Sequence, residues 1–399
     1  MRILQLCNRV PWPPKDGGAI GMYNFTKSYH ALGCEVSMLA INTPKHYIAP
    51  AFFPPEFATL ADIQTVDVDT RIKPLDAFLN IFSTSSYNIV RFDDAAYREA
   101  LTGILKQKQF DVVHVDGLFM SMYANTVREH SDALLVMRAH NVEHIIWQRM
   151  AETEKPGLKK QYLRLLARRL RKYEEQKLNE FDALLPISEV DDKMLREMGS
   201  KVKHITVPAG VDPDKFRADF SKMEFPSLFH LGALDWLPNQ QAVRWFLQEV
   251  WPEVSRKFPE LSFHIAGRHI PEWVKQTDLE NVIVAGEVDD AAAFMNSKAI
   301  MIVPLLSGSG VRLKVLEGMA LGKAIVSTTV GAEGIEYRPS QDILIADSKD
   351  EFIKHISYLV ENRESLLKLG QNAIGLIEQK YTNRQIVKDL LAKYESLIG

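Results

Sequence analysis

The segment from Pro304 to Lys323 carries the residues best suited to holding a phosphate. It reads Pro-Leu-Leu-Ser-Gly-Ser-Gly-Val-Arg-Leu-Lys-Val-Leu-Glu-Gly-Met-Ala-Leu-Gly-Lys. An apolar run ends near Pro304, and the pattern predicts a helix that begins near Val311. A glycine-rich loop before a helix N-terminus binds anions well, because free N–H groups and the helix dipole both favour negative charge. We therefore predict that the loop over 307–311 binds phosphate.

Charged side chains in the same segment extend this prediction to a nucleoside diphosphate. Arg312 and Lys314 bring positive charge to the loop, and Glu317 lies about one helical turn beyond Lys314. A carboxylate at that place can accept two hydrogen bonds from the vicinal hydroxyls of a ribose. The alternative for each of these residues is a surface charge on a solvated helix face.

A second glycine pair lies between the first expected strand and the first expected helix. Residues 8–19 read Asn-Arg-Val-Pro-Trp-Pro-Pro-Lys-Asp-Gly-Gly-Ala. Gly17 and Gly18 offer a small, flexible surface over which a ligand can approach the backbone. The segment lacks the Gly-x-Gly-x-x-Gly pattern, which is absent in the right context elsewhere, so a nicotinamide dehydrogenase is disfavoured. The alternative for this segment is an ordinary turn.

Polar side chains also stand where expected strands end. Arg138 and His140 end one strand, Asp116 ends another, and Arg268 follows a strand in the second half of the chain. Open parallel sheets bind ligands at the carboxyl edge of their strands, so these side chains are candidates for ligand contacts. A strand-end histidine can also be a hydrogen-bonded structural residue, and this alternative stays open.

The elements that must position these residues form an α/β pattern. Short apolar runs alternate with longer amphipathic segments, as in βαβ units of parallel sheets. Strands are expected over 2–7, 35–41, 63–68, 111–115, 134–138, 183–187, 227–232, 261–266, 282–285, 299–304, 324–327 and 342–346. A turn-rich, polar stretch interrupts the alternation near the middle of the chain. We predict one Rossmann-like domain over 1–207, a linker over 208–226, a second Rossmann-like domain over 227–382, and a helix over 383–398 that packs back on the first domain.

Size and composition exclude several classes of protein. The 399 residues are enough for two domains, and the net charge of −3 gives no reason to expect a nucleic-acid partner. Cys7 and Cys34 form no C-x-x-C pair, which fits a reducing cytoplasm. The N-terminal apolar run is too short for a signal peptide, and no run reaches the roughly 18 apolar residues of a transmembrane helix. No Asp-x-Asp stands in a suitable strand-end context, so no metal site is expected.

One predicted helix, over 158–177, is strongly basic. It contains Lys159, Lys160, Arg164, Arg168, Arg169, Arg171 and Lys172. A basic amphipathic helix can lie on an anionic membrane, so peripheral contact with the inner membrane surface is one interpretation. A packed helix with a solvated basic face is the other. We expect a cytoplasmic protein in either case.

The sequence Glu317-Gly-Met-Ala-Leu-Gly-Lys323 resembles the donor-binding signature of glycosyltransferase family 4. In that signature two glutamates are separated by seven residues, and this chain has Ser309 where the first glutamate would stand. A subset of the family carries a Gly-Ser-Gly-x-Arg-Leu-Lys loop that is similar to the loop here. We therefore interpret Ser309 as variation within the family. The resemblance covers essentially the whole chain.

The resemblance implies a GT-B fold, in which two Rossmann-like domains face each other across a cleft. It also implies a metal-independent hexosyltransferase that uses a UDP or GDP sugar, needs no cofactor and retains the anomeric configuration. The acceptor would be a carbohydrate or a lipid-linked carbohydrate in surface polysaccharide or glycolipid synthesis. Residue patterns and resemblance together assign catalysis to His140, Arg312 and Lys314, donor binding to Gly17, Gly18, Arg268, Gly308, Ser309, Gly310, Val311 and Glu317, and the acceptor side to Asp116 and Arg138.

Two other functions stay open at this point. A nucleotide-sugar epimerase shares the two-domain architecture, although it needs a carboxylate and histidine set for proton abstraction. A regulatory protein that binds a nucleotide-sugar without turnover is the non-enzymatic alternative, and Ser309 would then mark the loss of activity.

Overall fold

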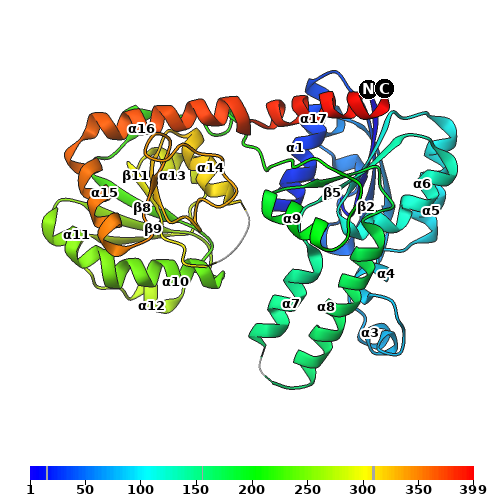
Figure 1. Ribbon diagram of the computed structural model, residues 1–399, viewed down its shortest axis with the longest axis horizontal. Coiled ribbons are helices and arrows are strands. Elements are labelled where there is room, and N and C mark those ends of the chain that lie inside the picture. Colours follow the sequence, from blue (N-terminus) through cyan, green and yellow to red (C-terminus); the bar gives the residue numbers. More distant parts are fainter. Residues whose placement is uncertain (15–16, 155, 308–310) are drawn as a thin grey trace. The chain divides into compact units, whose positions relative to one another are not determined.

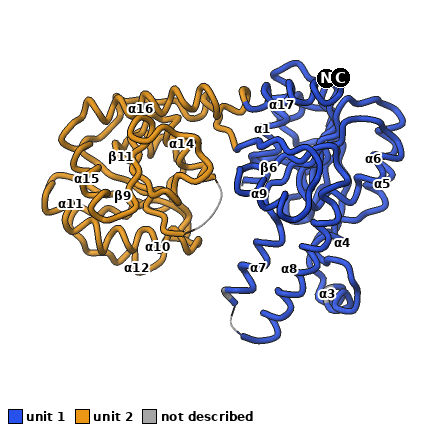
Figure 2. Tube along the Cα trace, viewed as in Figure 1, with its two compact units in different colours: residues 1–208, 386–399 blue, residues 209–385 orange. Residues whose placement is uncertain are grey.

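The computed structural model describes residues 1–14, 17–154, 156–307 and 311–399. They form two compact α/β units, residues 1–208 with 386–399 and residues 209–385 (Figure 2). Each unit has one parallel sheet with helices on both faces (Figure 1). The predicted pair of Rossmann-like domains is therefore confirmed.

The sheet of unit 1 has seven parallel strands in the order β3-β2-β1-β4-β5-β6-β7. The strands are β1 Arg2–Cys7, β2 Glu35–Asn42, β3 Asp62–Asp67, β4 Val112–Asp116, β5 Leu134–Ala139, β6 Ala183–Pro186 and β7 Lys203–His204. The six expected strands are present with small shifts at their ends. The seventh, β7, was not predicted because a two-residue strand has no recognisable apolar run.

Helices cover this sheet on both sides. They are α1 Gly17–Ala31, α2 Pro55–Ala58, α3 Pro74–Asn80, α4 Tyr87–Val90, α5 Ala95–Gln107, α6 Ala124–His130, α7 Glu143–Thr153, α8 Leu158–Lys177, α9 Glu189–Glu197 and most of α17 Asn383–Ile398. Successive strand residues alternate between the two faces, so Leu4 packs in the cluster with α5 and α6 while Ile3 packs in the cluster with α1 and α17. Short 3₁₀ turns, η1 Pro44–His46, η2 Pro50–Phe52 and η3 Leu118–Tyr123, complete the unit before α6.

The last helix, α17, belongs to the core of unit 1. Ile386, Val387, Leu390 and Tyr394 are buried there at helical spacing, beside the strands β1, β4 and β5. Because the side chains at these positions share one face of the helix, that apolar stripe holds α17 on the sheet.

The sheet of unit 2 has six parallel strands in the order β10-β9-β8-β11-β12-β13. They are β8 Ser227–Leu231, β9 Ser262–Ala266, β10 Val282–Gly286, β11 Ile300–Val303, β12 Ala324–Ser327 and β13 Leu344–Ile345. The helices are α10 Leu237–Trp245, α11 Trp251–Lys257, α12 Glu272–Lys275, α13 Ala291–Asn296, α14 Leu313–Ala320, α15 Lys349–Glu361 and α16 Arg363–Leu376, with η4 Phe220–Lys222 and two π segments, η5 Phe246–Val250 and η6 Ile377–Tyr381.

The stretch over 208–226 is not a linker, which corrects the sequence prediction. All of it except its first residue belongs to unit 2. Val211 forms a parallel bridge with Thr382, and Phe216 is buried in the unit's core. The turn-rich composition gave no indication of these two contacts, because a single buried phenylalanine produces no periodic apolar pattern.

The end of the family signature has a structural role. Lys323 is fully buried, and its Nζ donates to the carbonyl oxygens of Asn296 at 3.3 Å and Lys298 at 3.1 Å. Burial lowers its pKa to about 8. Gly322 has a φ of 64°, and a Cβ there would lie 2.7 Å from Phe220. The final Gly-Lys pair therefore closes the turn between α14 and β12.

The described part of the chain contains no helix long and apolar enough to cross a bilayer.

Candidate functional site

Unit 1 has a cavity of about 690 Å³ at the carboxyl edge of its sheet. Five neighbouring strands each contribute a residue that follows the strand, and these residues are Asn8, Thr43, Thr70, Gly117 and His140. Chain connections at this edge leave the sheet, so side chains here can face a ligand.

His140 stands in this cavity between two glycines. A Cβ on Gly21 of α1 would lie 3.5 Å from its Cε1, and a Cβ on Gly117 would lie 3.6 Å from its Cδ2. Gly117 has a φ of 89°, where L side chains are strained. The imidazole is 20% exposed, so one part of it reaches the cavity. The structure thus brings the predicted His140 to a ligand-accessible place.

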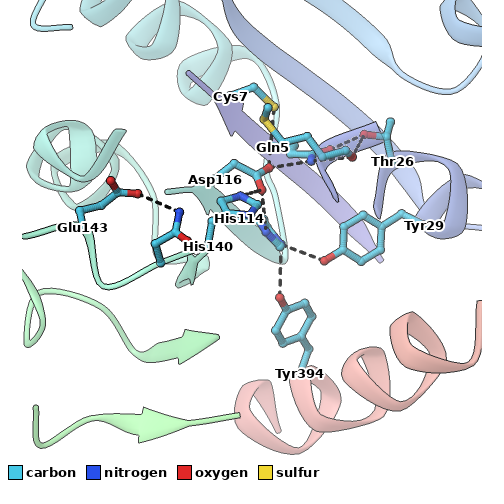
Figure 3. A network of polar contacts seen from close by, with 11 residues as sticks. Gln5, Cys7, Thr26, Tyr29, His114, Asp116, His140, Glu143 and Tyr394 are labelled. Carbon is cyan, nitrogen blue, oxygen red and sulfur yellow. Dashed lines mark hydrogen bonds and ion pairs between the residues drawn. The ribbon is translucent and has the colours of Figure 1, made fainter. Parts of the chain in front are cut away.

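The buried carboxylate of Asp116 contacts His140. Asp116 Oδ1 lies 3.3 Å from His140 Nε2, and Asp116 Oδ2 accepts a hydrogen bond from Gln5 Nε2 at 2.7 Å (Figure 3). Gln5 in turn accepts one from Thr26 Oγ1 at 2.7 Å. Asp116 is fully buried and is not among the residues that line the cavity. Its carboxylate therefore contacts His140, whereas the sequence predicted a contact with an acceptor.

The protonation states follow from burial and these contacts. Burial alone would raise the pKa of Asp116, but the charge and hydrogen bonds of His114 and His140 hold that pKa well below its usual range. Burial lowers the pKa of His140, so its imidazole is neutral at pH 7. Because Asp116 is ionised and can only accept, Nε2 carries the proton and Nδ1 is an acceptor.

The network continues to the last helix of the chain. His114 Nδ1 lies 2.9 Å from the hydroxyl of Tyr29 and 3.5 Å from that of Tyr394 on α17 (Figure 3). His114 Nε2 is 3.6 Å from Asp116 Oδ1. Gln5 and Tyr394 were missed in the sequence. A glutamine inside an otherwise apolar strand was a usable signal, whereas nothing in the sequence indicated a contact that spans 280 positions.

Arg138 does not reach the cavity, which differs from the expected acceptor contact. Its side chain is buried on the face of β5 that packs against α1, because it lies two residues after Val136 on the same face. The guanidinium lies 3.7 Å from the ring of Phe25. Nε and Nη1 have no hydrogen-bond partner within the described residues.

Glu143 begins α7 at the cavity wall. Its backbone N–H and that of His144 donate to the buried carboxylate of Glu174 on α8. Burial and the charge of Glu174 raise the pKa of Glu143 to about 7. This side chain is therefore partly protonated at neutral pH.

In unit 2, the predicted donor segment follows β11. Gly308, Ser309 and Gly310 lie outside the described residues, and α14 begins at Leu313, two residues later than expected. Arg312 is the N-cap residue, with an extended backbone. Its guanidinium lies 5.0 Å from the ring of Trp236, and burial lowers its pKa while Glu333 opposes the shift.

Lys314 and Glu317 form an ion pair on the first turn of α14, with Nζ 2.6 Å from Oε2. The carboxylate side chain is only 9% exposed, while the lysine is 43% exposed. The sequence predicted separate ligands for the two residues. The structure pairs them with each other, so Lys314 also orients Glu317.

The remaining donor-side candidates follow a strand or lie at the start of a helix, in unit 2 or in unit 1. Arg268 is exposed after β9, and Val311 packs against Gly334. Gly17 begins α1 with open space around it, whereas Gly18 lines the cavity of unit 1. Their positions are compatible with ligand contacts.

A histidine and a close backbone contact in unit 2 were not predicted. His230 is the next-to-last residue of β8. Its Nδ1 lies 3.3 Å from the carbonyl oxygen of Ile302, and burial lowers its pKa to about 4. Gly267 has a φ of 150°, and a Cβ there would lie 1.8 Å from the carbonyl oxygen of Gly232. Only glycine fits at position 267, because a Cβ there would collide with the backbone of Gly232. No group of three or more His, Cys, Asp or Glu in the described ranges is arranged to hold a metal ion.

Comparisons with known proteins connect these features to one family. Residues 15–215 match the model described as Glycosyltransferase Family 4, and residues 225–362 match the one described as Glycosyl transferases group 1. The chain is 27% identical over 307 residues to an uncharacterized 44.6 kDa protein in the cps region of Klebsiella pneumoniae, covering 73% of this chain and 76% of that one.

Solved structures show the same fold at low sequence identity. Sucrose-phosphate synthase from Thermosynechococcus elongatus has a TM-score of 0.68 at 14% identity, covering 100% of this chain and 99% of that one. HepE from Anabaena in complex with UDP has a TM-score of 0.62 at 12% identity, covering 99% and 100%. The two Rossmann-like units are those of the GT-B fold. Because the Family 4 model covers half of the chain, this protein belongs to glycosyltransferase family 4.

Proposed function

We propose that the protein is a retaining hexosyltransferase that moves a sugar from a UDP- or GDP-sugar to a carbohydrate or lipid-linked acceptor. One observation carries the proposal: a buried glutamate, Glu317, is held by Lys314 on the first turn of a helix whose N-cap is Arg312. This arrangement suits a ribose and a diphosphate bound side by side. The similarity to a protein in a cps region supports a role in surface polysaccharide or glycolipid synthesis.

The donor binds to unit 2 in this proposal. Arg312, Lys314 and the loop over 307–311 neutralise the leaving diphosphate, so a divalent cation is not needed. Glu317 accepts hydrogen bonds from the ribose hydroxyls, and Arg268 borders the base. Lys314 is exposed enough to turn from Glu317 towards a phosphate. HepE, which shares the fold, was crystallised with UDP, and this supports a uridine nucleotide as the first candidate.

The acceptor meets His140 of unit 1 in this proposal. Neutral Nδ1 of His140 accepts a hydrogen bond from a sugar hydroxyl, and Asp116 is a positioning residue that fixes the tautomer. The acceptor oxygen bonds to the anomeric carbon on the face that the diphosphate leaves. The bond from that carbon to the diphosphate breaks, and the acceptor proton passes to the leaving phosphate oxygen. This front-face substitution retains the anomeric configuration.

Helix α8 supplies a peripheral membrane contact in the same proposal. Arg164, Arg168 and Arg171 are exposed along it, whereas Arg169 binds the carbonyl oxygens of Asn80 and Ile81 next to α3. Figure 1 shows α7 and α8 extending from unit 1 with α3 nearby. Helix α3 exposes Leu75, Phe78 and Leu79. A basic helix beside exposed apolar side chains suits the cytoplasmic surface of an anionic membrane.

A thermal-shift screen tests the donor site. UDP, GDP, ADP, CMP and their sugars are compared with and without EDTA, for wild type and Glu317→Ala. We expect one diphosphate to raise the melting temperature, without an effect of EDTA and with loss of the shift in the variant. No shift with any nucleotide would overturn the proposal. A shift abolished by EDTA would overturn its metal-independent form.

A further inference from the structure

A row of buried polar groups leads from the last helix of the chain to His140. Tyr394 of α17 and Tyr29 of α1 are fully buried, and their hydroxyls lie 3.5 Å and 2.9 Å from Nδ1 of His114. The two hydroxyls also hydrogen-bond each other. On the other side of the ring, Nε2 of His114 lies 3.6 Å from Oδ1 of Asp116, the oxygen that contacts His140 at 3.3 Å (Figure 3). One carboxylate oxygen therefore faces both imidazoles.

One nitrogen in this row is not satisfied. Nε2 of His114 is buried, and among the described residues it has no close hydrogen-bond partner. Its distance of 3.6 Å from Asp116 is too long for a good hydrogen bond. An unsatisfied buried N–H costs free energy, and a small shift of the ring toward the carboxylate would satisfy it. Another contact must therefore hold the ring of His114 away from Asp116.

The two tyrosine hydroxyls provide that contact on the opposite side of the ring. Asp116 is ionised and can only accept, so the neutral ring of His114 carries its proton on Nε2 and presents Nδ1 as an acceptor. Burial raises the pKa of both hydroxyls, so Tyr29 and Tyr394 keep their protons and can donate to Nδ1. The ring of Phe25 packs edge-on against His114 with the ring centres 5.4 Å apart, which fixes the plane of the imidazole.

This restraint on one imidazole affects the other. Two N–H groups that share one carboxylate oxygen each bind it less tightly than one alone. We propose that Tyr29 and Tyr394 are positioning residues for His140. By restraining His114, they leave Oδ1 of Asp116 to Nε2 of His140. The ring proton of His140 then stays on Nε2, and Nδ1 stays free to accept a hydrogen bond from a sugar hydroxyl. The inference rests on the proposed function, which gives His140 that contact.

Magnetic resonance of the histidine rings tests the inference without any substrate. Full-length protein is made with isotope-labelled histidine, and proton–nitrogen correlation spectra distinguish the two tautomers of a neutral ring. The signals of His140 are assigned by their absence in His140→Gln. We expect the Nε2–H tautomer of His140 in the wild type and a mixture with the Nδ1–H tautomer in Tyr29→Phe. Tyr394→Phe should have a smaller effect, because Tyr29 is nearer to Nδ1 of His114.

A matched variant separates this positioning role from a general loss of packing. Tyr123→Phe removes another fully buried hydroxyl of unit 1, and the partners of that hydroxyl are backbone groups of Phe92 and Asp94. It should leave the tautomer of His140 and kcat unchanged. With the identified donor, Tyr29→Phe should lower kcat about two- to tenfold, since one neutral hydrogen bond is lost. The donor KM should not change, because the donor binds to unit 2.

Melting temperatures establish which variants are folded, and Tyr394→Phe decides the question by itself if Tyr29→Phe does not fold. An unchanged tautomer of His140 in the folded tyrosine variants, or an equal change in Tyr123→Phe, would overturn the inference. A changed tautomer with wild-type kcat would also overturn it. Absence of sugar transfer by the wild type would overturn the proposed function instead, because the tautomers are measured without donor or acceptor.

Discussion

The pair formed by Asp116 and His140 allows a direct test of the mechanism. Asp116→Asn keeps the shape of the side chain and removes its charge. The ionised carboxylate now accepts from Nε2 of His140 at 3.3 Å and from Gln5 at 2.7 Å. An asparagine can instead present its amide N–H to the imidazole, which would place the ring proton on Nδ1. The acceptor position that faces the sugar hydroxyl would then be lost.

The size of the effect follows from the lost interaction. A hydrogen bond to a charged group contributes about 1.5–3 kcal/mol, so kcat should fall roughly ten- to hundredfold. The donor KM should change little, because the diphosphate and ribose are held in unit 2. The carboxylate also stabilises the imidazolium, so its removal should lower the pKa of His140 further. The acidic limb of the pH–rate profile should therefore move to lower pH.

Initial-rate kinetics with the identified donor measure this effect. Asp111→Asn is the matched control, because Asp111 stands at the opposite end of the same strand and pairs with Arg2. It removes the same charge far from the cavity and should leave the kinetics unchanged. The melting temperature of both variants establishes that they are folded. A folded Asp116→Asn enzyme with wild-type kcat and an unmoved pH profile would refute the positioning role of Asp116.

Three further predictions concern unit 2. The free energy of unfolding should rise by about 3 kcal/mol between pH 8 and 10.5, because unfolded Lys323 keeps its proton up to its ordinary pKa while the folded residue loses it near 8. Denaturant titrations at several pH values measure this rise, and the free energy of unfolding of Lys323→Met should depend less on pH over the same range. Gly267→Ala should destabilise unit 2 by about 3 kcal/mol in urea denaturation, and wild-type stability would contradict the contact with Gly232. Lys314→Gln should weaken binding of the donor diphosphate about tenfold in calorimetry, whereas unchanged affinity would confine Lys314 to its pair with Glu317.

The strands were predictable from the sequence because parallel sheets are buried on both faces. Runs such as those over 2–7 and 324–327 are mostly apolar, and the structure begins and ends β1 and β12 at these residues. The two-residue strand β7 gave no such signal, whereas β13 lies within the expected strand over 342–346. The direction of Arg138 was available from the same alternation, since it shares a face with Val136. A charged residue at a strand end nevertheless favours a ligand contact over packing against α1.

Contacts between distant residues were beyond local patterns. The sequence indicated His140 and Asp116 separately, but not that Asp116 lies beneath the imidazole and out of reach of an acceptor. The pair of Lys314 and Glu317 was missed for a different reason. Their spacing of three residues is typical of helical ion pairs, but the two residue types also fit separate ligands.

The position of Tyr394 links the end of the chain to the polar network of unit 1. Its hydroxyl and that of Tyr29 meet at Nδ1 of His114, and His114 lies beside Asp116. All of these groups are buried, so a change at one of them acts on the others through a region of low dielectric. The helix that carries Tyr394 begins in unit 2 and is buried in unit 1 from Ile386 onward. The surroundings of Asp116, which contacts His140, are therefore complete only when α17 has packed on unit 1.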